Sequence, residues 1–435
     1  MLTTAVGRQV EWYLGCLATR GERAAVADAD RLTSAMPGLV PAAATQDELR
    51  HQWRVLSKFF PSRLLDAVAS SDFRLTVRLV DDNGRHWRLT VAVEETPPHR
   101  ISALRWEREF GAEVTVREAT EEDGAALADL ERRCPIVLDG RSITFDRGDD
   151  YFTFARLAAG CTVVLGCVAG VPAAVNCATL RTVQIGGRPL RILTGMHTRV
   201  LPEHQGKGLW PTVSGVLLEK YPFGSCIDAT MAVSAVENRA FHRAMASFPT
   251  WPVQAVRAHL STAALAGPRA GRQATPADAG AVVEMLNASH GGEELYLPYT
   301  EELLIERLTR APELYSWERI WLGDGAVVGV WPSGTSIRVI EESSTGRREW
   351  RRGLVLDYGF HAGAEAELEA LIRAWCGWLA ERGQNELCIF TSAGSAGEKL
   401  LTDLAERLEA FDVWTAGVEP PRAVDHGLYI DPIYF

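Results

Sequence analysis

The feature that most constrains the fold of this chain is an order of expected elements that occurs twice. Residues 113–120 (EVTVREAT) alternate like a strand that ends at a helix start, and a similar opening begins at residue 271 with GRQATPADAGAVVEMLNAS. After each opening, the pattern predicts a pair of strands, a further strand, an amphipathic helix and another strand. Because the same order fills about 150 residues twice, we expect two duplicated α/β domains.

The region before the repeats has a different pattern. Two helical segments, VEWYLGCLA and QDELRHQWRVLSKFF, precede the alternating runs FRLTVRLV and WRLTVAVEE, which flank Asp81-Asp82-Asn83-Gly84. Asn-Gly supplies the positive φ angles of a tight turn, so a β-hairpin is expected here. The segment LTVAVEETPPHRI resembles the cone-shaped leader domains of the nuclear-transport-factor-2-like (NTF2-like) family, which implies a small α+β domain over residues 1–110.

Composition narrows the class of protein. Asp and Glu number 56 against 45 for Lys and Arg, and the net charge of -11 argues against a nucleic-acid or anionic-membrane partner. No run approaches 18 apolar residues, and the start lacks a basic stretch followed by an apolar one, so we expect a cytoplasmic protein without a membrane partner. The eight cysteines are scattered without a CxxC, which favours reduced, buried thiols and no metal site.

The most informative motif is HTRVLPEHQGKGLWPTVSGVLLEKY, residues 197–221. A strand is expected to end at Val200, and a helical pattern begins near Leu209. The QGKG loop between them offers backbone N–H groups at a helix N-terminus, where they and the helix dipole can hold a pyrophosphate. Gly206 and Gly208 allow close approach of the backbone, and Lys207 is one of only four lysines. A strand-to-helix turn that uses glycine for geometry alone explains a GxG equally well.

The run VLPEHQGKGL resembles the acyl-CoA pyrophosphate motif of the GCN5-related N-acetyltransferases (GNAT), V-x-P-x-[FYH]-[RQ]-x-x-G-x-[GA]. Val200, Pro202, Gln205 and Gly208 match, whereas Trp210 replaces the usual small last residue. Further on, AVSAVENRAFHRAMASF resembles the N-x-A segment of the family, although Met245 stands where the family often has a tyrosine acid. The resemblance covers residues 113–262.

The resemblance implies a fold and a cosubstrate. It implies an α/β (α+β) chain with two tandem GNAT-like mixed-sheet domains, a catalytic one at 111–265 and a degenerate one at 266–435, whose LVLDYGFHAGAEAE has no comparable loop. The cosubstrate would be acetyl-CoA. The backbone of Val200 would meet its acyl carbonyl, and Asn238 would line the pantetheine arm. The pyrophosphate would be held by the N–H groups of Gln205, Gly206, Lys207, Gly208, Leu209 and Trp210.

Three side chains are candidates for proton transfer, which this reaction needs at the amine and at the departing thiolate. His197 lies three residues before Val200, Asp228 lies in the apolar run CIDATMAV, and Tyr151 follows an acidic segment. A structural role on a strand explains His197 equally well, a satisfied core carboxylate explains Asp228, and a solvated acidic turn before a helix start explains the segment of Tyr151. Asp146, Asp149 and Asp150 could receive a cationic amine, unless they form only a solvated turn, and the carboxylate of Phe435 is a further candidate base by resemblance to tandem acetyltransferases.

The sequence therefore predicts an acetyl-CoA-dependent N-acetyltransferase for a small-molecule or peptide amine, with attack of the amine on the thioester. The leader domain would cover the catalytic domain or form a homodimer contact. Two alternatives stay open. One is a noncatalytic acyl-CoA sensor or interaction module, favoured by Met245 and Trp210, and the other is acyl transfer to a carrier-protein thiol or a decarboxylase-like variant of the fold.

Overall fold

The computed structural model of the 435-residue chain describes residues 4–19, 63–80, 86–108, 113–246, 248–422 and 424–434. They fall into two compact units that are discontinuous in sequence. Unit 1 comprises residues 1–118, 164–176 and 198–230, and unit 2 comprises residues 119–163, 177–197 and 231–435. Among the described residues, no helix is long and apolar enough to cross a membrane.

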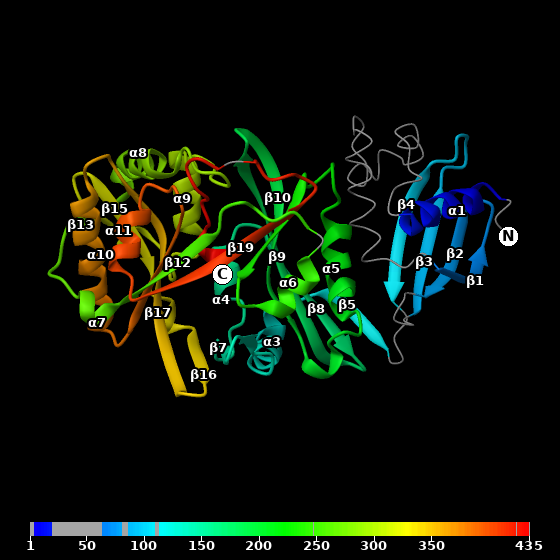
Figure 1. Cartoon of the computed structure of the whole chain (residues 1–435), viewed down its shortest axis with the longest axis horizontal. Coiled ribbons are helices and arrows are strands. Elements are labelled where there is room, and N and C mark those ends of the chain that lie inside the picture. Colours follow the sequence, from blue (N-terminus) through cyan, green and yellow to red (C-terminus); the bar gives the residue numbers. More distant parts are fainter. Residues whose placement is uncertain are drawn as a thin grey trace. The chain divides into compact units, whose positions relative to one another are not determined.

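The N-terminal part of unit 1 is a four-stranded antiparallel sheet with a helix packed on it (Figure 1). The expected hairpin strands are confirmed, because β2 (Arg74–Val80) pairs antiparallel with β3 (His86–Val93). The Asn-Gly turn and the second expected helix lie outside the described residues. An NTF2-like cone therefore stays a prediction. The other two strands of this sheet are β1 (Arg63–Ser70) and β4 (Ile101–Arg108), and the helix is α1 (Ala5–Ala18).

The rest of unit 1 is built around a strand–loop–helix segment. The strand β10 (Arg188–Val200) ends at Val200, and α5 (Leu209–Lys220) begins nine residues later, as the sequence predicts. Two shorter strands, β5 (Val114–Glu118) and β8 (Cys161–Val168), pair antiparallel beside it in the same unit. The strands β9 (Val171–Ile185) and β10 are long enough to contribute residues to both units.

Unit 2 contains the helices and strands of the second repeat in the predicted order. Pro and Gly punctuation marks their ends, and Thr275 with Asp278 forms a capping box before α8. The elements are β13 (Arg272–Gln273), α8 (Ala279–His290), α9 (Glu301–Arg310), β14 (Ile320–Leu322), β15 (Ala326–Trp331), β17 (Gly346–Phe360), α10 (Glu365–Ala380), β18 (Glu386–Ser392) and α11 (Glu398–Leu404).

The same unit holds several elements from the first repeat. Thr120 and Asp123 form a second capping box ahead of α3, so both repeats open with the same local geometry. These elements are α3 (Gly124–Arg132), β6 (Ile136–Leu138), β7 (Arg141–Asp146), α4 (Thr153–Leu157), β11 (Ala229–Ala235), α6 (Arg239–Met245), β12 (Ala255–Ser261) and α7 (Thr262–Leu265).

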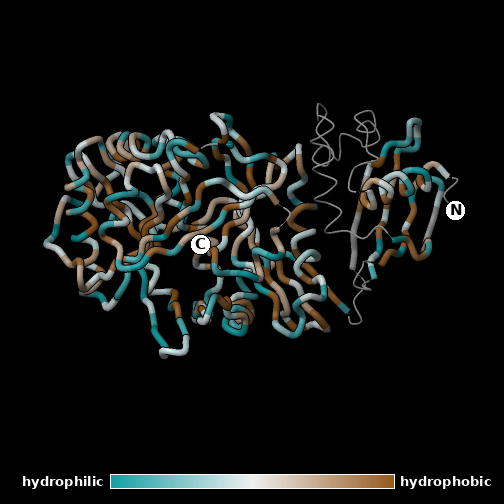
Figure 2. Tube along the Cα trace, in the orientation of Figure 1, coloured by the Kyte–Doolittle hydropathy of each residue, from teal (hydrophilic) through white to brown (hydrophobic). Residues whose placement is uncertain are grey.

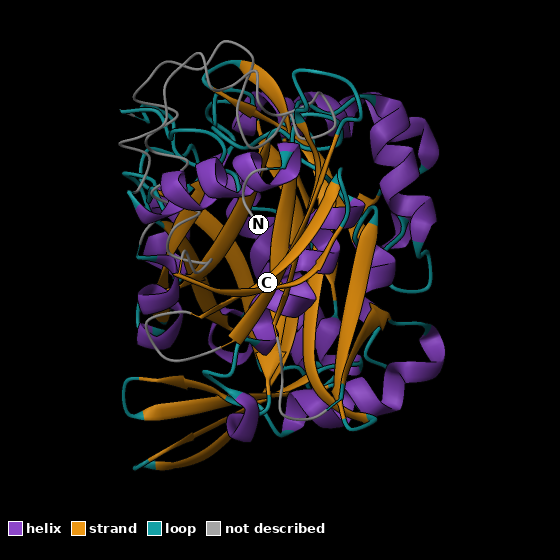
Figure 3. Cartoon of the chain, turned by 90° about the vertical axis from the view of Figure 1, so that its right-hand side faces the viewer, coloured by secondary structure: helices purple, strands orange, loops and turns teal. Residues whose placement is uncertain are grey.

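The last strands of the two predicted repeats are exchanged. In unit 2, β12 pairs antiparallel with both β18 and β19 (Arg407–Ala416), and the strand order there is β13-β14-β15-β17-β18-β12-β19-β11. The last strand of the second repeat thus lies between two strands of the first. This pairing makes one large mixed sheet, because β17 and β18 are parallel whereas β12 is antiparallel to its neighbours. Helices cover both sides of the strands (Figure 3).

A buried ionic network joins the exchanged strands. Glu409 on β19 accepts from Arg257 on β12, and its Oε2 lies 3.1 Å from Nε2 of His259. The other ring nitrogen of His259 lies 3.0 Å from Glu386 on β18. Although His259, Glu386 and Cys388 lie close enough together to hold a metal ion, guanidinium groups already occupy both carboxylates, since Arg352 donates to Glu386. We therefore interpret the cluster as an ion-pair network.

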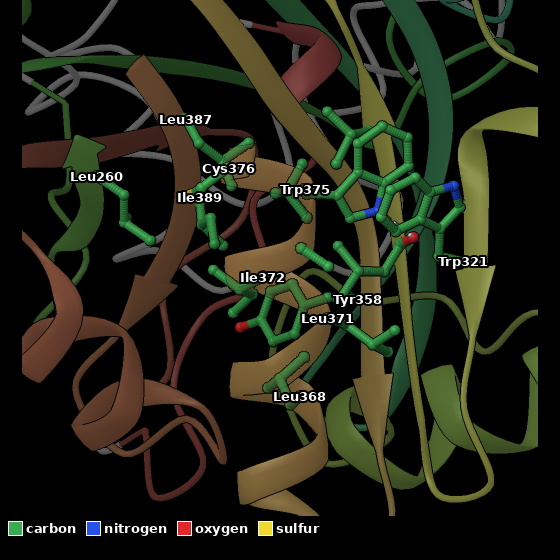
Figure 4. Close-up of a cluster of buried hydrophobic side chains, with 14 of the residues drawn as sticks. Leu260, Trp321, Tyr358, Leu368, Leu371, Ile372, Trp375, Cys376, Leu387 and Ile389 are labelled. Atoms are coloured by element: carbon green, nitrogen blue, oxygen red, sulfur yellow. Dashed lines mark hydrogen bonds between the residues drawn. The ribbon is translucent and has the colours of Figure 1, made fainter. Parts of the chain in front are cut away.

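The second repeat has a dense aromatic core and a polar arm. The indoles of Trp321 and Trp375 stack with ring centroids 4.2 Å apart, and Trp375 Nε1 donates to the Val328 carbonyl (Figure 4). The arm is the hairpin of β16 (Arg338–Ser343) and β17, which projects from the sheet and is largely hydrophilic (Figures 1 and 2). Its β16 pairs antiparallel with β7 of the first repeat.

Candidate functional site

The loop from Val200 to Leu209 joins the end of a strand to the N-terminus of a helix. A short 3₁₀ helix, Pro202–His204, follows the strand, and a turn leads into α5. Gly206 and Gly208 have φ angles of 69° and 84°, a region that only glycine adopts without strain. Gly208 is the N-cap of α5 and has no side chain over the helix end. The first turn of this helix contains no acidic residue, so its positive dipole end is not neutralised by a side chain.

Some of the expected N–H donors are already used inside the loop. The N–H groups of Gln205 and Lys207 donate to the carbonyls of Pro202 and His204, and Pro211, in the first turn of α5, has no N–H group. Leu209 and Trp210 are the first two residues of the helix, where N–H groups have no carbonyl partner in the helix itself. These two N–H groups and the exposed Lys207 are therefore the groups of this loop that we expect to be available to an anion.

The loop is tied back onto its own strand and helix. Gln205 Nε2 donates to the Val200 carbonyl at 3.1 Å. Deeper in the unit, the buried Asn176 accepts from Thr198 Oγ1 at 2.8 Å and donates to Ser214 Oγ at 2.9 Å, which links β9, β10 and α5. We did not predict this role of Asn176 from the sequence. The signal was a single asparagine in the apolar run VPAAVNCATL, because a buried amide needs hydrogen-bond partners.

His197 sits in a buried cluster of unit 2 around Arg147. The guanidinium of Arg147 lies 3.2 Å from His197 Nδ1, and the rings of Phe154 and His197 have centroids 4.0 Å apart. Because a guanidinium only donates, Nδ1 is an acceptor and the ring proton is on Nε2. His197 also has a φ angle of 48°, an uncommon conformation for a residue with a side chain. Glu131 pairs with Arg147 and holds the guanidinium in place.

Tyr151 lies in the same cluster and is fully buried. The Arg147 guanidinium lies 5.5 Å from its ring centroid, and its hydroxyl lies 3.3 Å from Cys177 Sγ. Burial raises the pKa of the phenol well above 10. A phenol with that pKa and no exposed surface is a poor proton donor to a leaving thiolate.

Two other expected positions have clear local roles. Asn238 is the N-cap of α6, where Oδ1 accepts from the Phe241 N–H at 3.2 Å and Nδ2 donates to Ser234 Oγ at 3.0 Å. Met245, at the position of the family's tyrosine, is buried. Asp228 was expected within a strand, and this was wrong in detail: it lies one residue before β11 and is half-buried.

The aspartates expected to receive an amine are largely paired with arginines. Asp146 accepts from Arg338 and lies 3.5 Å from Arg132, and Asp150 accepts from Arg156. Burial raises the pKa of both carboxyl groups. Hydrogen bonds and the guanidinium groups lower it by a larger amount, so the net pKa is below the usual value. Asp149 is exposed. Of the three, only Asp149 is without an arginine partner among the described residues.

In the second repeat, residues of the chain itself fill the space where two neighbouring strands separate. The strands β17 and β18 pair only from Arg352 to Leu354, and the space beyond is lined by Leu428, Tyr429 and Ile430 near the C-terminus. The remaining cavity is about 10 Å³, about enough for one water molecule. The first turn of α10 also carries Glu365 and Glu367, unlike that of α5. The terminal residue, Phe435, lies outside the described residues.

Comparison with known proteins shows a shared fold. No family model matches the sequence, and no curated protein matches it. Among solved structures, N-myristoyltransferase of Saccharomyces cerevisiae with bound myristoyl-CoA has a TM-score of 0.53 at 11% identity, over 79% of this chain and 89% of that one. A structure of the same enzyme with myristoyl-CoA and inhibitors has a TM-score of 0.52 at 12% identity, over 78% and 87%.

A further match is a GCN5-related N-acetyltransferase from Sphaerobacter thermophilus, with a TM-score of 0.43 at 17% identity over 70% of this chain and 97% of that one. Of these structures, the two of the myristoyltransferase have TM-scores above 0.5, so the comparison of folds rests on them. At these identities, the comparison establishes the large mixed α/β fold of that enzyme in this chain and no activity. The predicted fold class is thereby confirmed.

Proposed function

We propose that this protein is an acyl-CoA-dependent N-acyltransferase. Residues 111–265 form the catalytic domain in this proposal, residues 266–435 a degenerate partner, and residues 1–110 a leader domain. The observation that carries the proposal is the segment from Val200 to Leu209. It combines a strand end, two glycines with positive φ and a helix N-terminus without acidic residues, which together suit a pyrophosphate.

The proposed cosubstrate is acetyl-CoA. In this proposal, the N–H groups of Leu209 and Trp210 and the ammonium of Lys207 hold the pyrophosphate, and Asn238 lines the pantetheine arm. The length of the acyl chain is to be tested, because the structure of the yeast enzyme with the same fold contains myristoyl-CoA. The acceptor is a primary amine of a small molecule or a peptide. A cytoplasmic location and a homodimer formed through the leader domain stay predictions.

The chemistry is a direct transfer. The amine nitrogen attacks the thioester carbon, the C–N bond forms, the C–S bond breaks, and the amine proton must leave while the thiolate gains one. Asp228 is our first candidate for the base, because it is half-buried and lies one residue before β11. His197, with its proton on Nε2, suits hydrogen-bond donation better than proton abstraction. Tyr151 is the weakest of the three candidates, because it is buried and has a raised pKa.

A noncatalytic acyl-CoA sensor is the second candidate. It is favoured by the burial of Tyr151 and Met245 and by the engagement of His197 with Arg147. A sensor would bind the cofactor through the same loop but would not cleave the thioester.

Turnover separates the two candidates. The full chain is incubated with acetyl-CoA or myristoyl-CoA and a panel of primary amines and peptides, and free thiol is measured. An enzyme releases CoA in proportion to one of the amines, and Asp228→Asn lowers kcat with a smaller effect on the acyl-CoA KM. Tight binding of acyl-CoA with no amine-dependent thiol release would support the sensor and contradict the enzyme.

A further inference from the structure

A pocket of about 430 Å³ lies within unit 2, away from the filled gap between β17 and β18. It forms where the C-terminal turn of α10 meets the end of β15 and the 3₁₀ helix Trp317–Arg319. Its volume is in the range of small-molecule sites. Most of its lining is aromatic, apolar or cationic: Trp331, Trp378, Leu314, Pro332, Arg319 and Arg382.

The two arginines stack against one tryptophan. The guanidinium carbon of Arg382 lies 3.8 Å from the ring centroid of Trp378, and that of Arg319 lies 5.2 Å from it. A guanidinium that contacts an indole through its flat face keeps its N–H groups at the edge for oxygen acceptors. Arg382 uses one of them on the Trp378 carbonyl at 3.0 Å. The guanidinium of Arg319 makes no hydrogen bond or ion pair with any described residue, whereas its backbone N–H donates to the Ser316 carbonyl at 2.8 Å.

The positive charges of this pocket are only partly balanced, because Arg382 lies 3.5 Å from the exposed Glu381 whereas the Arg319 guanidinium has no acidic partner among the described residues. Burial lowers the pKa of Arg319, Glu318 raises it, and the like charge of Arg382 lowers it again, so the net pKa is below its ordinary value. Glu313, the acid in the lining, is exposed and pairs with neither arginine among the described residues. A bound anion would stabilise the half-buried Arg319, which has the like charge of Arg382 beside it and no acidic partner of its own.

The apolar part of the pocket is rigid. Trp331 is buried at the end of β15, and Trp378 packs edge-on against Trp375 with ring centroids 5.3 Å apart. Trp375 in turn stacks on Trp321 in the core. Indoles held in this way present fixed apolar surfaces that suit a flat ligand.

We propose that this pocket binds a small molecule that carries an oxyanion on a flat apolar body, such as an aromatic carboxylate or an aryl phosphate. The edges of Arg319 and Arg382 hold the oxyanion, and Trp331 and Trp378 contact the ring. The site is independent of the proposed acyltransferase reaction, because it requires no residue of the Val200–Leu209 segment.

Calorimetric titration of the full chain tests this. The probes are 2-naphthoate, 2-naphthyl phosphate and the neutral 2-naphthalenemethanol. We expect binding of one anionic probe per chain and at least tenfold weaker binding of the neutral one, because a charge-assisted hydrogen bond is lost. A preference between the two anions assigns the oxyanion as carboxylate or phosphate. Equal affinity for the neutral probe, or no binding of either anion at millimolar concentration, would overturn the proposal.

Variants of single arginines locate the site. Arg319→Gln should weaken binding of the anionic probe about tenfold or more, and Arg382→Gln serves as an independent second variant. The matched control is Arg347→Gln, which removes the same charge from an exposed arginine on the hairpin arm, 3.7 Å from Glu342. Circular dichroism checks that each variant is folded. Unchanged affinity in both pocket variants would mean that the arginines only cover the tryptophans, and the proposal would be wrong.

Discussion

The buried ion pair of Glu131 and Arg147 supports a quantitative prediction. The two side chains are 0% and 2% exposed, and Arg147 also contacts His197 and the ring of Phe154. Substituting Arg147→Met leaves the Glu131 carboxylate buried without its cation, which costs about 3–5 kcal/mol of the free energy of unfolding. Glu131→Leu leaves the guanidinium unpaired and should cost a similar amount. The double variant should be far less destabilised than the sum of the two, since neither charge remains.

Urea unfolding of the full chain, followed by circular dichroism, measures these differences. Each single variant should lower the urea midpoint of the transition that includes this cluster by about 1 to 2 M, given the usual dependence of unfolding free energy on denaturant. The control is Lys399→Met, which breaks an exposed pair with Asp403 and should cost about 0.5 kcal/mol or less. If the double variant lost as much as the two singles together, the pair would not be coupled and the reasoning would fail.

Three further predictions concern stability. Burial raises the pKa of Glu386 and Glu409, but neighbouring arginines lower it more, so the folded pKa lies below the unfolded one. Their contribution to stability is thus complete above about pH 4.5, so the thermal midpoint should begin to fall below that pH and continue to fall as the pH is lowered further. In Glu409→Gln the thermal midpoint should be lower at pH 7 and should change less as the pH is lowered. The same dependence of the midpoint on pH as in the unmodified chain would contradict this. Asn176→Ala should lower the free energy of unfolding by about 1–3 kcal/mol, because its hydroxyl partners lose their bonds, and unaltered chemical denaturation would show that the link is dispensable. Asp431→Ala should lower the thermal midpoint, because Arg307 is buried against it at 2.7 Å, and an equal midpoint would mean that the C-terminal segment adds no stability.

Local patterns in the sequence predict much of this fold. The end of β10 at Val200 and the start of α5 at Leu209 follow from glycine punctuation and a change of apolar period, which are properties of neighbouring residues. The hairpin of β2 and β3 follows from alternation and Asn-Gly for the same reason. Such signals act within a few residues, so the structure agrees with them where they are strong.

What the sequence does not predict depends on distant partners. The exchange of β12 and β19 requires pairing over about 150 residues, and alternation alone does not say which strand lies beside which. Asp146 looks like an exposed acid until Arg338, 192 residues away, is placed beside it. The filling of the second repeat's gap by Leu428–Ile430 is equally nonlocal. The position of the candidate loop could therefore be predicted from the sequence. Which of the candidate aspartates pair with arginines could not.

Acyl-CoA binding at the Val200–Leu209 segment is tested most directly by calorimetric titration of acetyl-CoA and free CoA into the full chain and two glycine variants. Gly206 and Gly187 have φ angles of 69° and 72° and open space around an added side chain, so Gly206→Glu and Gly187→Glu carry equal backbone strain. Only the first places a carboxylate in the proposed pyrophosphate loop. We expect binding at one site per chain that is retained in Gly187→Glu and lost in Gly206→Glu. No binding to the unmodified chain, or equal binding to both variants, would contradict this expectation.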